Sequence, residues 1–123
     1  MTIGLKQTST VEVDSTNTAL ALGSGDMEVF ATPALVALME NAAMLAAAHA
    51  LPEGSTTVGA QIAVEHLKPS KIGATVAATA TLTSVEGRKW TFSIEASDES
   101  GLVGRATHVR YEVDRARFLA KLG

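Results

Sequence analysis

The chain has 123 residues, of which 46% are hydrophobic and 19% are charged. This length and composition predict one folded domain over residues 1–123 and exclude a disordered chain. Ten Lys and Arg against thirteen Asp and Glu give a net charge of -3, which argues against a nucleic-acid partner. There is no cysteine, so disulfides, thiolate nucleophiles and Cys-ligated zinc are excluded.

The chain gives only weak signals before residue 32. Residues 1–7 turn polar too soon for the apolar run of a secretory signal, so a cytoplasmic location is expected. Residues 8–13 alternate weakly and are predicted as a strand, whereas residues 14–27 are too polar and glycine-rich for an assignment.

One helix is predicted over residues 32–49. Thr32 suits the N-cap, Pro33 suits the first helical position, and Pro52 follows the end of the segment. Between its ends the segment is apolar on almost every face, which is typical of a helix surrounded by protein or lipid. Its alanine-rich composition and the carboxylate of Glu40 at mid-length favour a buried helix over a membrane span, so no membrane partner is expected.

The spacing of apolar residues changes from a helical to a twofold period after this helix. The alternation predicts four strands, over residues 58–66, 75–84, 90–97 and 102–113. Short turn sequences separate the last three strands, which predicts an antiparallel meander. In the last strand Arg105 interrupts the apolar face, which indicates a bulge, and His108 is expected on the strand surface or at an interface. The elements together predict an α+β fold in which an antiparallel sheet of about five strands wraps around the long helix.

Glu40 and His66 are the residues that first suggest a functional site. The helical neighbours of Glu40 three and four positions away offer no partner for its carboxylate, and an unpaired buried charge is unfavourable. Glu40 therefore either meets solvent at that turn or belongs to a functional site. His66 ends a strand and is predicted on its inner face, together with Val58, Ala60, Ile62 and Val64. The alternative for His66 is a core histidine bonded to backbone, and the alternative for Asn41 is a hydrogen-bonded core amide.

The start of the helix offers donor groups. A helix N-terminus presents free N–H groups and the positive end of a dipole, which together stabilise an oxyanion. Pro33 lacks an N–H, so Ala34 and Leu35 are expected to supply the donors, while Thr32 by itself is expected to be the helix cap. The sequence contains no HExxH motif and no phosphate-loop or dinucleotide fingerprint, so no metal and no cofactor are expected.

Five segments, in the same order and with the same spacing, resemble the fluoroacetyl-CoA thioesterase-like group of the hot-dog superfamily. They are residues 28–32 (EVFAT), 38–40 (LME), 64–66 (VEH), 84–88 (SVEGR) and 104–108 (GRATH). In that family the catalytic set is the threonine that opens the central helix, the glutamate eight residues later and the histidine that ends the next strand. These positions correspond to Thr32, Glu40 and His66, and all three residue types are present.

The resemblance implies a hot-dog fold, a homodimer whose sheets join edge to edge, and an acyl-CoA site at the subunit interface. It implies hydrolysis of a thioester, with Glu40 as general base or nucleophile and His66 orienting or protonating a reacting group. Thr32 and the first-turn residues 33–35 would hold the thioester carbonyl, and Asn41 would be a further substrate-binding residue.

Two departures from the family pattern bear on the acyl group. The fluoroacetyl-specific member has a phenylalanine-bearing lid before the helix, whereas residues 22–27 here are shorter and lack an aromatic side chain. Pro33 stands where that member has glycine. A short-chain or otherwise small acyl-CoA is therefore the expected substrate class. A hot-dog hydratase or dehydratase and a non-catalytic acyl-CoA binding module are the alternative functions.

Overall fold

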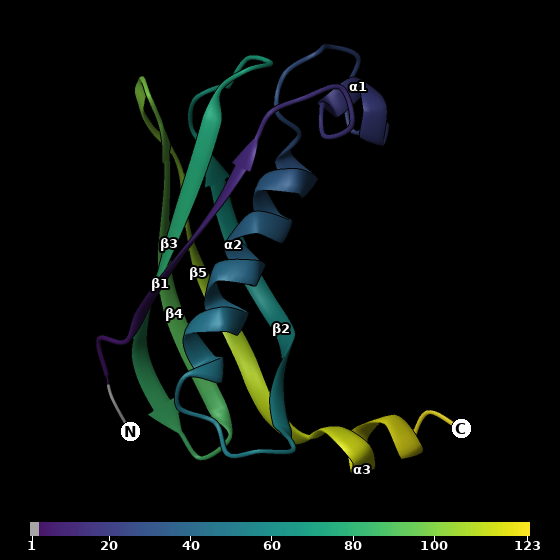
Figure 1. Cartoon of the computed structure of the whole chain (residues 1–123), viewed down its shortest axis with the longest axis vertical. Helices are drawn as coiled ribbons and strands as arrows, with labels where there is room; N and C mark the ends of the chain where they lie inside the picture. The colour runs from purple at the N-terminus through teal and green to yellow at the C-terminus, as the bar shows by residue number, and fades with distance from the viewer. Residues whose placement is uncertain (1–2) are drawn as a thin grey trace.

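The computed structural model describes residues 3–123, in which a curled sheet holds one long helix and two short helices lie outside it (Figure 1). In chain order the elements are β1 (Lys6–Glu12), α1 (Ala19–Leu22), α2 (Thr32–Ala48), β2 (Ser55–His66), β3 (Thr75–Glu86), β4 (Lys89–Asp98), β5 (Gly101–Asp114) and α3 (Arg115–Ala120).

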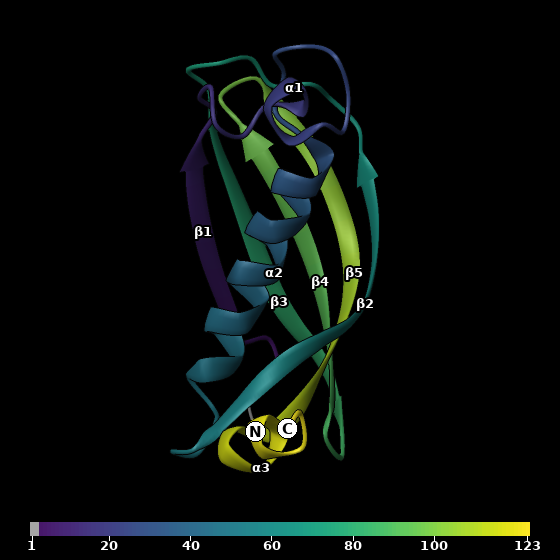
Figure 2. The same ribbon diagram turned by 90° about the vertical axis from the view of Figure 1, so that its right-hand side faces the viewer.

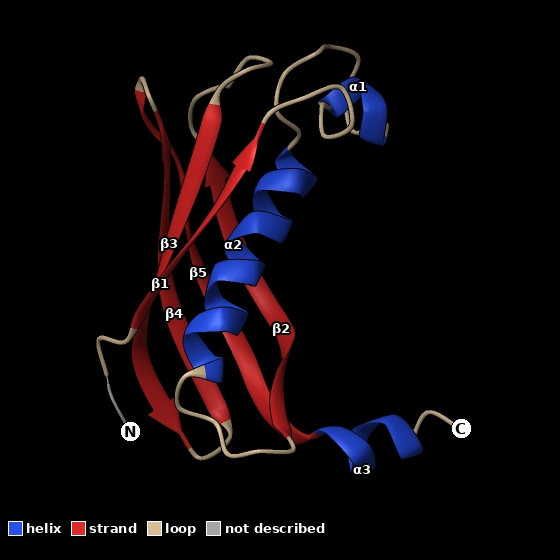
Figure 3. Cartoon of the chain, viewed as in Figure 1, coloured by secondary structure: helices blue, strands red, loops and turns tan. Residues whose placement is uncertain are grey.

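All strand pairs of the sheet are antiparallel, and the strand order is β1-β3-β4-β5-β2. The neighbours β3, β4 and β5 form the predicted meander, and β1 and β2 are the edges. The sheet curls around α2, which lies along its concave face (Figure 2). The short helices α1 and α3 lie at opposite ends of the sheet (Figure 3). The predicted α+β fold, a five-stranded sheet around one long helix, is confirmed.

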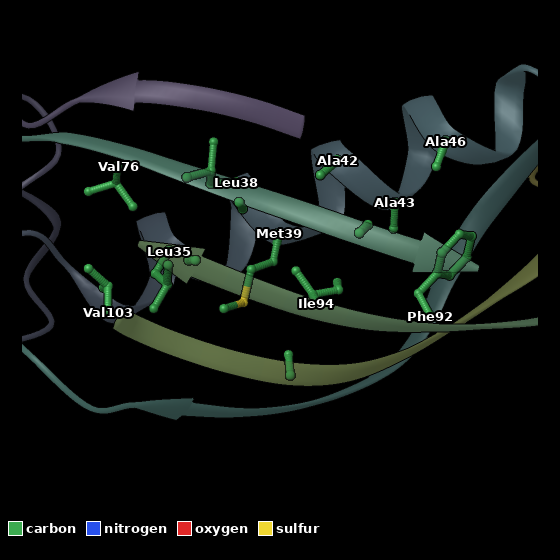
Figure 4. Packing of buried hydrophobic residues seen from close by; sticks show 14 of the residues in the cluster. Leu35, Leu38, Met39, Ala42, Ala43, Ala46, Val76, Phe92, Ile94 and Val103 are labelled. Atoms are coloured by element: carbon green, nitrogen blue, oxygen red, sulfur yellow. The ribbon is translucent and has the colours of Figure 1, made fainter. Parts of the chain in front are cut away.

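Helix α2 packs on the sheet through a mixture of small and large side chains. Its buried residues are Leu35, Leu38, Met39, Ala42, Ala43, Ala46 and Ala47. These face sheet residues such as Val76, Ile94 and Phe92 (Figure 4). At Gly104 the approach is so close that an added Cβ would lie 2.6 Å from the Glu65 carbonyl oxygen and 3.1 Å from Leu35 Cδ2. Close packing at these positions fixes the height and rotation of the helix above the sheet.

No helix within residues 3–123 combines the length and apolar character needed to cross a membrane. One face of α2 is covered by the sheet, whereas Ala37, Leu45 and Ala48 on the opposite face are exposed, so the helix is buried on one side and not all round.

A bulge in β2 corrects the predicted inner face of that strand. The register against β5 shifts between Gly59 and Gln61, so Gly59 faces the helix before the shift and Ile62 faces it afterwards. Val58 pairs with Tyr111 on the opposite face, and Ala60 is the bulged residue. The predicted inward position of these two residues is therefore wrong. The extra residue changes which side chains point inward, because successive strand residues alternate between faces.

A second bulge corrects the prediction for β5. The register against β4 pairs Ala96 with Gly104 and Ser97 with Leu102, which leaves Val103 as the bulged residue, two positions before Arg105. From there Ala106, His108 and Arg110 are buried in alternation. The expected surface position of His108 is wrong, since only 1% of this residue is exposed.

Candidate active site

The hydroxyl of Thr32 contacts His66 and does not cap the helix. The N-cap residue is Ala31, no side chain caps the helix, and Thr32 is its first residue. Thr32 Oγ1 lies 2.8 Å from Nδ1 of His66, at the end of β2. The expectation that Thr32 serves only as a cap is thus wrong, and its hydroxyl belongs to a polar pair between the start of α2 and the end of β2.

His66 keeps one ring nitrogen free. Its Nε2 is buried and has no hydrogen-bond partner within residues 3–123. Burial lowers the pKa of His66, an effect partly offset by a backbone contact of Lys68. The ring is therefore neutral near pH 7, with one nitrogen bonded to Thr32 and the other unpaired.

The Thr32 and His66 pair lines a hollow of about 290 Å³. Its other walls are Ala19, Ser24, Val29, Phe30, Leu67, Lys68 and Pro69. Val29, Lys68 and Pro69 also line a second hollow of about 580 Å³, which contains Ser70, Lys71 and Asp98. The two hollows have these three wall residues in common, and together they are called here the groove beside the start of α2.

The first turn of α2 offers fewer free donors than the sequence predicted. The N–H of Leu35 donates to the Ala31 carbonyl oxygen at 3.0 Å, and its side chain is buried in the core. Leu35 is therefore not the expected oxyanion donor. Ala34 precedes the first helical hydrogen bond and remains a candidate donor, while Pro33 is exposed beside it.

Glu40 lies two helical turns from Thr32, a rise of about 12 Å along the helix axis. Its Oε2 is 4.0 Å from Nη1 of Arg110, and 40% of its side chain is exposed. A Cβ added to Gly59 would lie 2.8 Å from the same carboxylate oxygen. The partner that Glu40 lacked on its own helix is thus an arginine on β5. In one chain, Glu40 belongs to a different cluster from Thr32 and His66.

Arg110, His108 and Thr57 surround Glu40 and were not identified from the sequence. Arg110 Nε donates to Thr57 Oγ1 at 2.7 Å and Nη2 donates to the Thr57 carbonyl oxygen at 2.9 Å. Nη1 lies 3.2 Å from Nε2 of His108. The signal that identifies this cluster is the alternation of Ala106, His108 and Arg110, which becomes visible only once the bulge is placed at Val103.

Asn41 lies on another side of the helix, away from both clusters. Its Oδ1 accepts a hydrogen bond of 2.7 Å from the hydroxyl of Ser9 on edge strand β1. It lines another groove of about 320 Å³ with residues of β1 and α2 and with Phe30, which also borders the hollow of Thr32 and His66. The structure thus ties the Asn41 side chain to β1, and this side chain has no hydrogen bond to Thr32, His66 or the Glu40 carboxylate among the described residues. Within residues 3–123 there is also no group of three or more His, Asp or Glu side chains arranged to hold a metal ion.

A curled antiparallel sheet around a central helix, with a Thr–His pair at the helix start, places the chain in the class of hot-dog-fold thioesterases. Residues 13–116 match the model of the fluoroacetyl-CoA-specific thioesterase family. The fluoroacetyl-CoA thioesterase of Streptantibioticus cattleyicolor is 40% identical over 95 residues, which cover 77% of this chain and 68% of that protein. The chain therefore belongs to the fluoroacetyl-CoA-specific thioesterase family and is an acyl-CoA thioesterase.

Solved structures agree with this assignment. A variant of the fluoroacetyl-CoA-specific thioesterase in complex with fluoroacetate and CoA superposes with a TM-score of 0.89 at 34% identity, over 96% of this chain and 99% of that chain. A hot-dog-like protein from Thermanaerovibrio acidaminovorans superposes with a TM-score of 0.88 at 27% identity, over 98% of this chain and 89% of that chain. The predicted hot-dog fold is confirmed by these neighbours.

Proposed function

We propose that the chain hydrolyses a short-chain or otherwise small acyl-CoA at a site that two copies of the chain build together. The observation that carries this proposal is the 2.8 Å contact between Thr32 and His66, two residues that line the groove beside the helix start. A hydroxyl, a neutral imidazole and a helix N-terminus are groups suited to orienting and polarising an acyl thioester.

The chemistry divides among three residues. Thr32 and the N–H of Ala34 hold the thioester carbonyl oxygen as negative charge develops on it. The Glu40 carboxylate either takes a proton from the attacking water or attacks the carbonyl carbon itself, and in the second case water then hydrolyses the acyl-enzyme. In both routes the C–S bond breaks and the CoA thiolate leaves, with the neutral His66 ring orienting the reacting groups by hydrogen bonding. The proton that the attacking water loses balances the proton that the thiolate takes up. The products are the free acid and CoA.

The separation between Glu40 and the Thr32–His66 pair supports a dimeric site. Within one chain the two clusters lie about 12 Å apart along α2. Edge strand β2 carries Gly59 next to Glu40 and has His66 at its end. Antiparallel pairing of two β2 strands about a twofold axis near residues 62 and 63 would place Gly59 opposite the partner subunit's His66. Glu40 of one copy would then complete the site of the other.

The two short helices support the same arrangement. Both α1 and α3 project on the side of the sheet that carries α2, one at each end of the sheet (Figures 1 and 2). They leave apolar side chains exposed, with Leu20 and Leu22 on α1 and Phe118 and Leu119 on α3. A partner joined antiparallel through β2 would bring its α1 toward this α3. Covering these side chains would add apolar burial to the strand pairing.

Release of free thiol from a panel of short- to medium-chain and aromatic acyl-CoAs tests the proposal. The purified chain is compared with Glu40→Gln and His66→Asn, each checked by circular dichroism and thermal unfolding. Hydrolysis of small acyl-CoAs by the parent and a loss of about 100-fold or more in both folded variants would support it. Turnover unchanged in both variants would overturn the assigned roles. Binding of acyl-CoA without thiol release would favour a binding module, and consumption of an enoyl-CoA without thiol release would favour a hydratase.

A further inference from the structure

A polar cluster beneath Glu40 has no part in the chemistry assigned so far. It consists of His108 and Arg110 on β5 and Thr57 on β2, all at least nine-tenths buried. Burying a charged group such as the Arg110 guanidinium is unfavourable unless hydrogen bonds or an opposite charge compensate for the lost hydration.

The hydrogen bonds of His108 define its protonation state. Nδ1 lies 2.8 Å from the carbonyl oxygen of Gln61, which only accepts, so Nδ1 carries the proton. Nε2 then accepts a hydrogen bond from Arg110 Nη1 at 3.2 Å. Burial lowers the pKa of His108 and the adjacent Arg110 lowers it further, against opposing effects of the Gln61 carbonyl and Glu40. The imidazole is therefore a neutral acceptor with a fixed tautomer, assigned from its hydrogen-bond partners.

These bonds hold the Arg110 guanidinium on three sides. Thr57 accepts from Nε and Nη2, and His108 accepts from Nη1. The Glu40 carboxylate lies 4.0 Å from the same Nη1. A planar guanidinium presents its donors in fixed directions, so the bond to His108 sets the angle at which Nη1 faces the carboxylate.

The backbone of Gly59 lies close to Glu40, Arg110 and His108. A Cβ built on Gly59 would lie 2.8 Å from Glu40 Oε2, 3.4 Å from Arg110 Nη1 and 3.5 Å from His108 Cε1. The bulge next to Gly59 is also where Gln61 supplies the acceptor for His108. One irregularity of β2 therefore makes room for the carboxylate and fixes the histidine beneath it.

We propose that His108 is a positioning residue, which aims the carboxylate of Glu40 by holding the Arg110 guanidinium in one orientation. This inference rests on the role proposed for Glu40 in thioester hydrolysis. It assigns His108 no contact with the substrate.

Two substitutions of His108 each retain one of its two hydrogen bonds and remove the other. In His108→Gln the side-chain oxygen takes the place of Nε2 and still accepts from Arg110, whereas in His108→Asn the amide still donates to Gln61 but does not reach Arg110. We expect His108→Asn to lower kcat for a small acyl-CoA about 10- to 100-fold with KM changed by less than about 3-fold, because a misaimed catalytic group slows the chemical step. His108→Gln should recover most of kcat. Equal kcat losses in both variants, or equal losses of thermal stability without a change in kcat, would overturn the proposal.

A double-mutant cycle shows whether His108 acts through Arg110. In a chain that carries Arg110→Gln, the further change His108→Asn should alter kcat by less than about 2-fold, since the group that it orients is gone. Full additivity of the two losses would overturn the inference. Glu40→Gln is measured in the same series: if it leaves turnover intact, the proposed role of Glu40 fails. If Glu40→Gln abolishes turnover while His108→Asn does not lower it, only the positioning role fails.

Discussion

The Thr32 hydroxyl has a different partner in the structure from the one that the sequence predicts. By sequence it has the position and chemistry of a helix cap, yet the capping position belongs to Ala31 and the hydroxyl lies 2.8 Å from His66. A side chain that does not cap the helix contributes little to its stability. Removal of this hydroxyl is therefore expected to change the activity much more than the stability.

Substitution of Thr32 by valine tests that expectation. Thr32→Val keeps the shape and removes the hydroxyl, and we expect kcat to fall about 10- to 100-fold because the group proposed to hold the thioester carbonyl is lost. Thermal unfolding should shift by less than about 2 °C, whereas loss of a true cap would lower stability by about 1 kcal/mol. Thr32→Ser, which retains the hydroxyl, is the control and should keep most of the activity. A lower unfolding temperature with unchanged kcat would show that the hydroxyl serves the helix.

At both Gly59 and Gly104 an added Cβ would lie too close to a neighbouring atom, at 2.8 Å and 2.6 Å respectively. In Gly59→Ala the new methyl group meets the flexible end of Glu40, so the carboxylate shifts and the backbone keeps its place. We expect kcat to fall about 10-fold or more with only a small loss of stability. In Gly104→Ala the methyl group would lie 2.6 Å from a backbone oxygen, and we expect a lower unfolding temperature. Kinetics and thermal unfolding of both variants check this, and a large loss of stability in Gly59→Ala would contradict it.

Some residues of the candidate site can be identified from the sequence alone, and others cannot. Thr32, Glu40 and His66 can be identified because residue type, position in the helix and alternation along the strand are local properties of the sequence. The family resemblance marks the same positions. Arg110 and His108 were missed because their inward orientation depends on the bulge at Val103, which is set by pairing with β4. Leu35 was misassigned because the helix begins one residue earlier than predicted from Pro33, which places the Leu35 N–H in a helical hydrogen bond.

At the scale of elements, strand periodicity predicted the strands and missed their irregularities. Apolar alternation predicts that β3, β4 and β5 exist, since each has one buried face, and the short turns between them predict their antiparallel order. A bulge changes the alternation by a single residue, so the sequence pattern on either side of it still appears regular. The short helices α1 and α3 have four and six residues, too few to show the apolar period from which a helix is predicted.

The segment between β2 and β3 is held against β4 by a buried carboxylate. Asp98 Oδ2 lies 2.6 Å from Lys68 Nζ and accepts a hydrogen bond of 2.7 Å from Ser70 Oγ. These partners, with Lys68 first, lower the pKa of Asp98 to about 2, and only 4% of its side chain is exposed. Because Lys68 and Ser70 also line the groove next to His66, this contact fixes the wall of the candidate site.

Asp98→Asn should therefore weaken the fold and change its response to acid. The folded-state pKa lies below the ordinary value of 3.8, so the folded chain binds fewer protons than the unfolded chain in this range. The stabilisation is complete above about pH 4 and is lost as the pH falls toward 2. We expect the variant to lose about 1–3 kcal/mol at pH 7 through its missing charged hydrogen bonds, and a smaller loss at pH 2. Urea unfolding at both pH values measures this, and an equal loss at both would contradict the assigned cause.

At the scale of the whole molecule, the proposed division of the site between two copies predicts complementation between inactive variants. Glu40→Gln and His66→Asn are co-expressed with different affinity tags, and the mixed dimer is isolated through both tags. One of its sites combines an intact Thr32–His66 pair with an intact Glu40 from the other chain, whereas the second site carries both defects. We expect the mixed dimer to recover about half of the parent activity per dimer, while each variant alone stays inactive. A mixed dimer as inactive as both variants would mean that each chain supplies its own Glu40, because then neither of its sites would be intact.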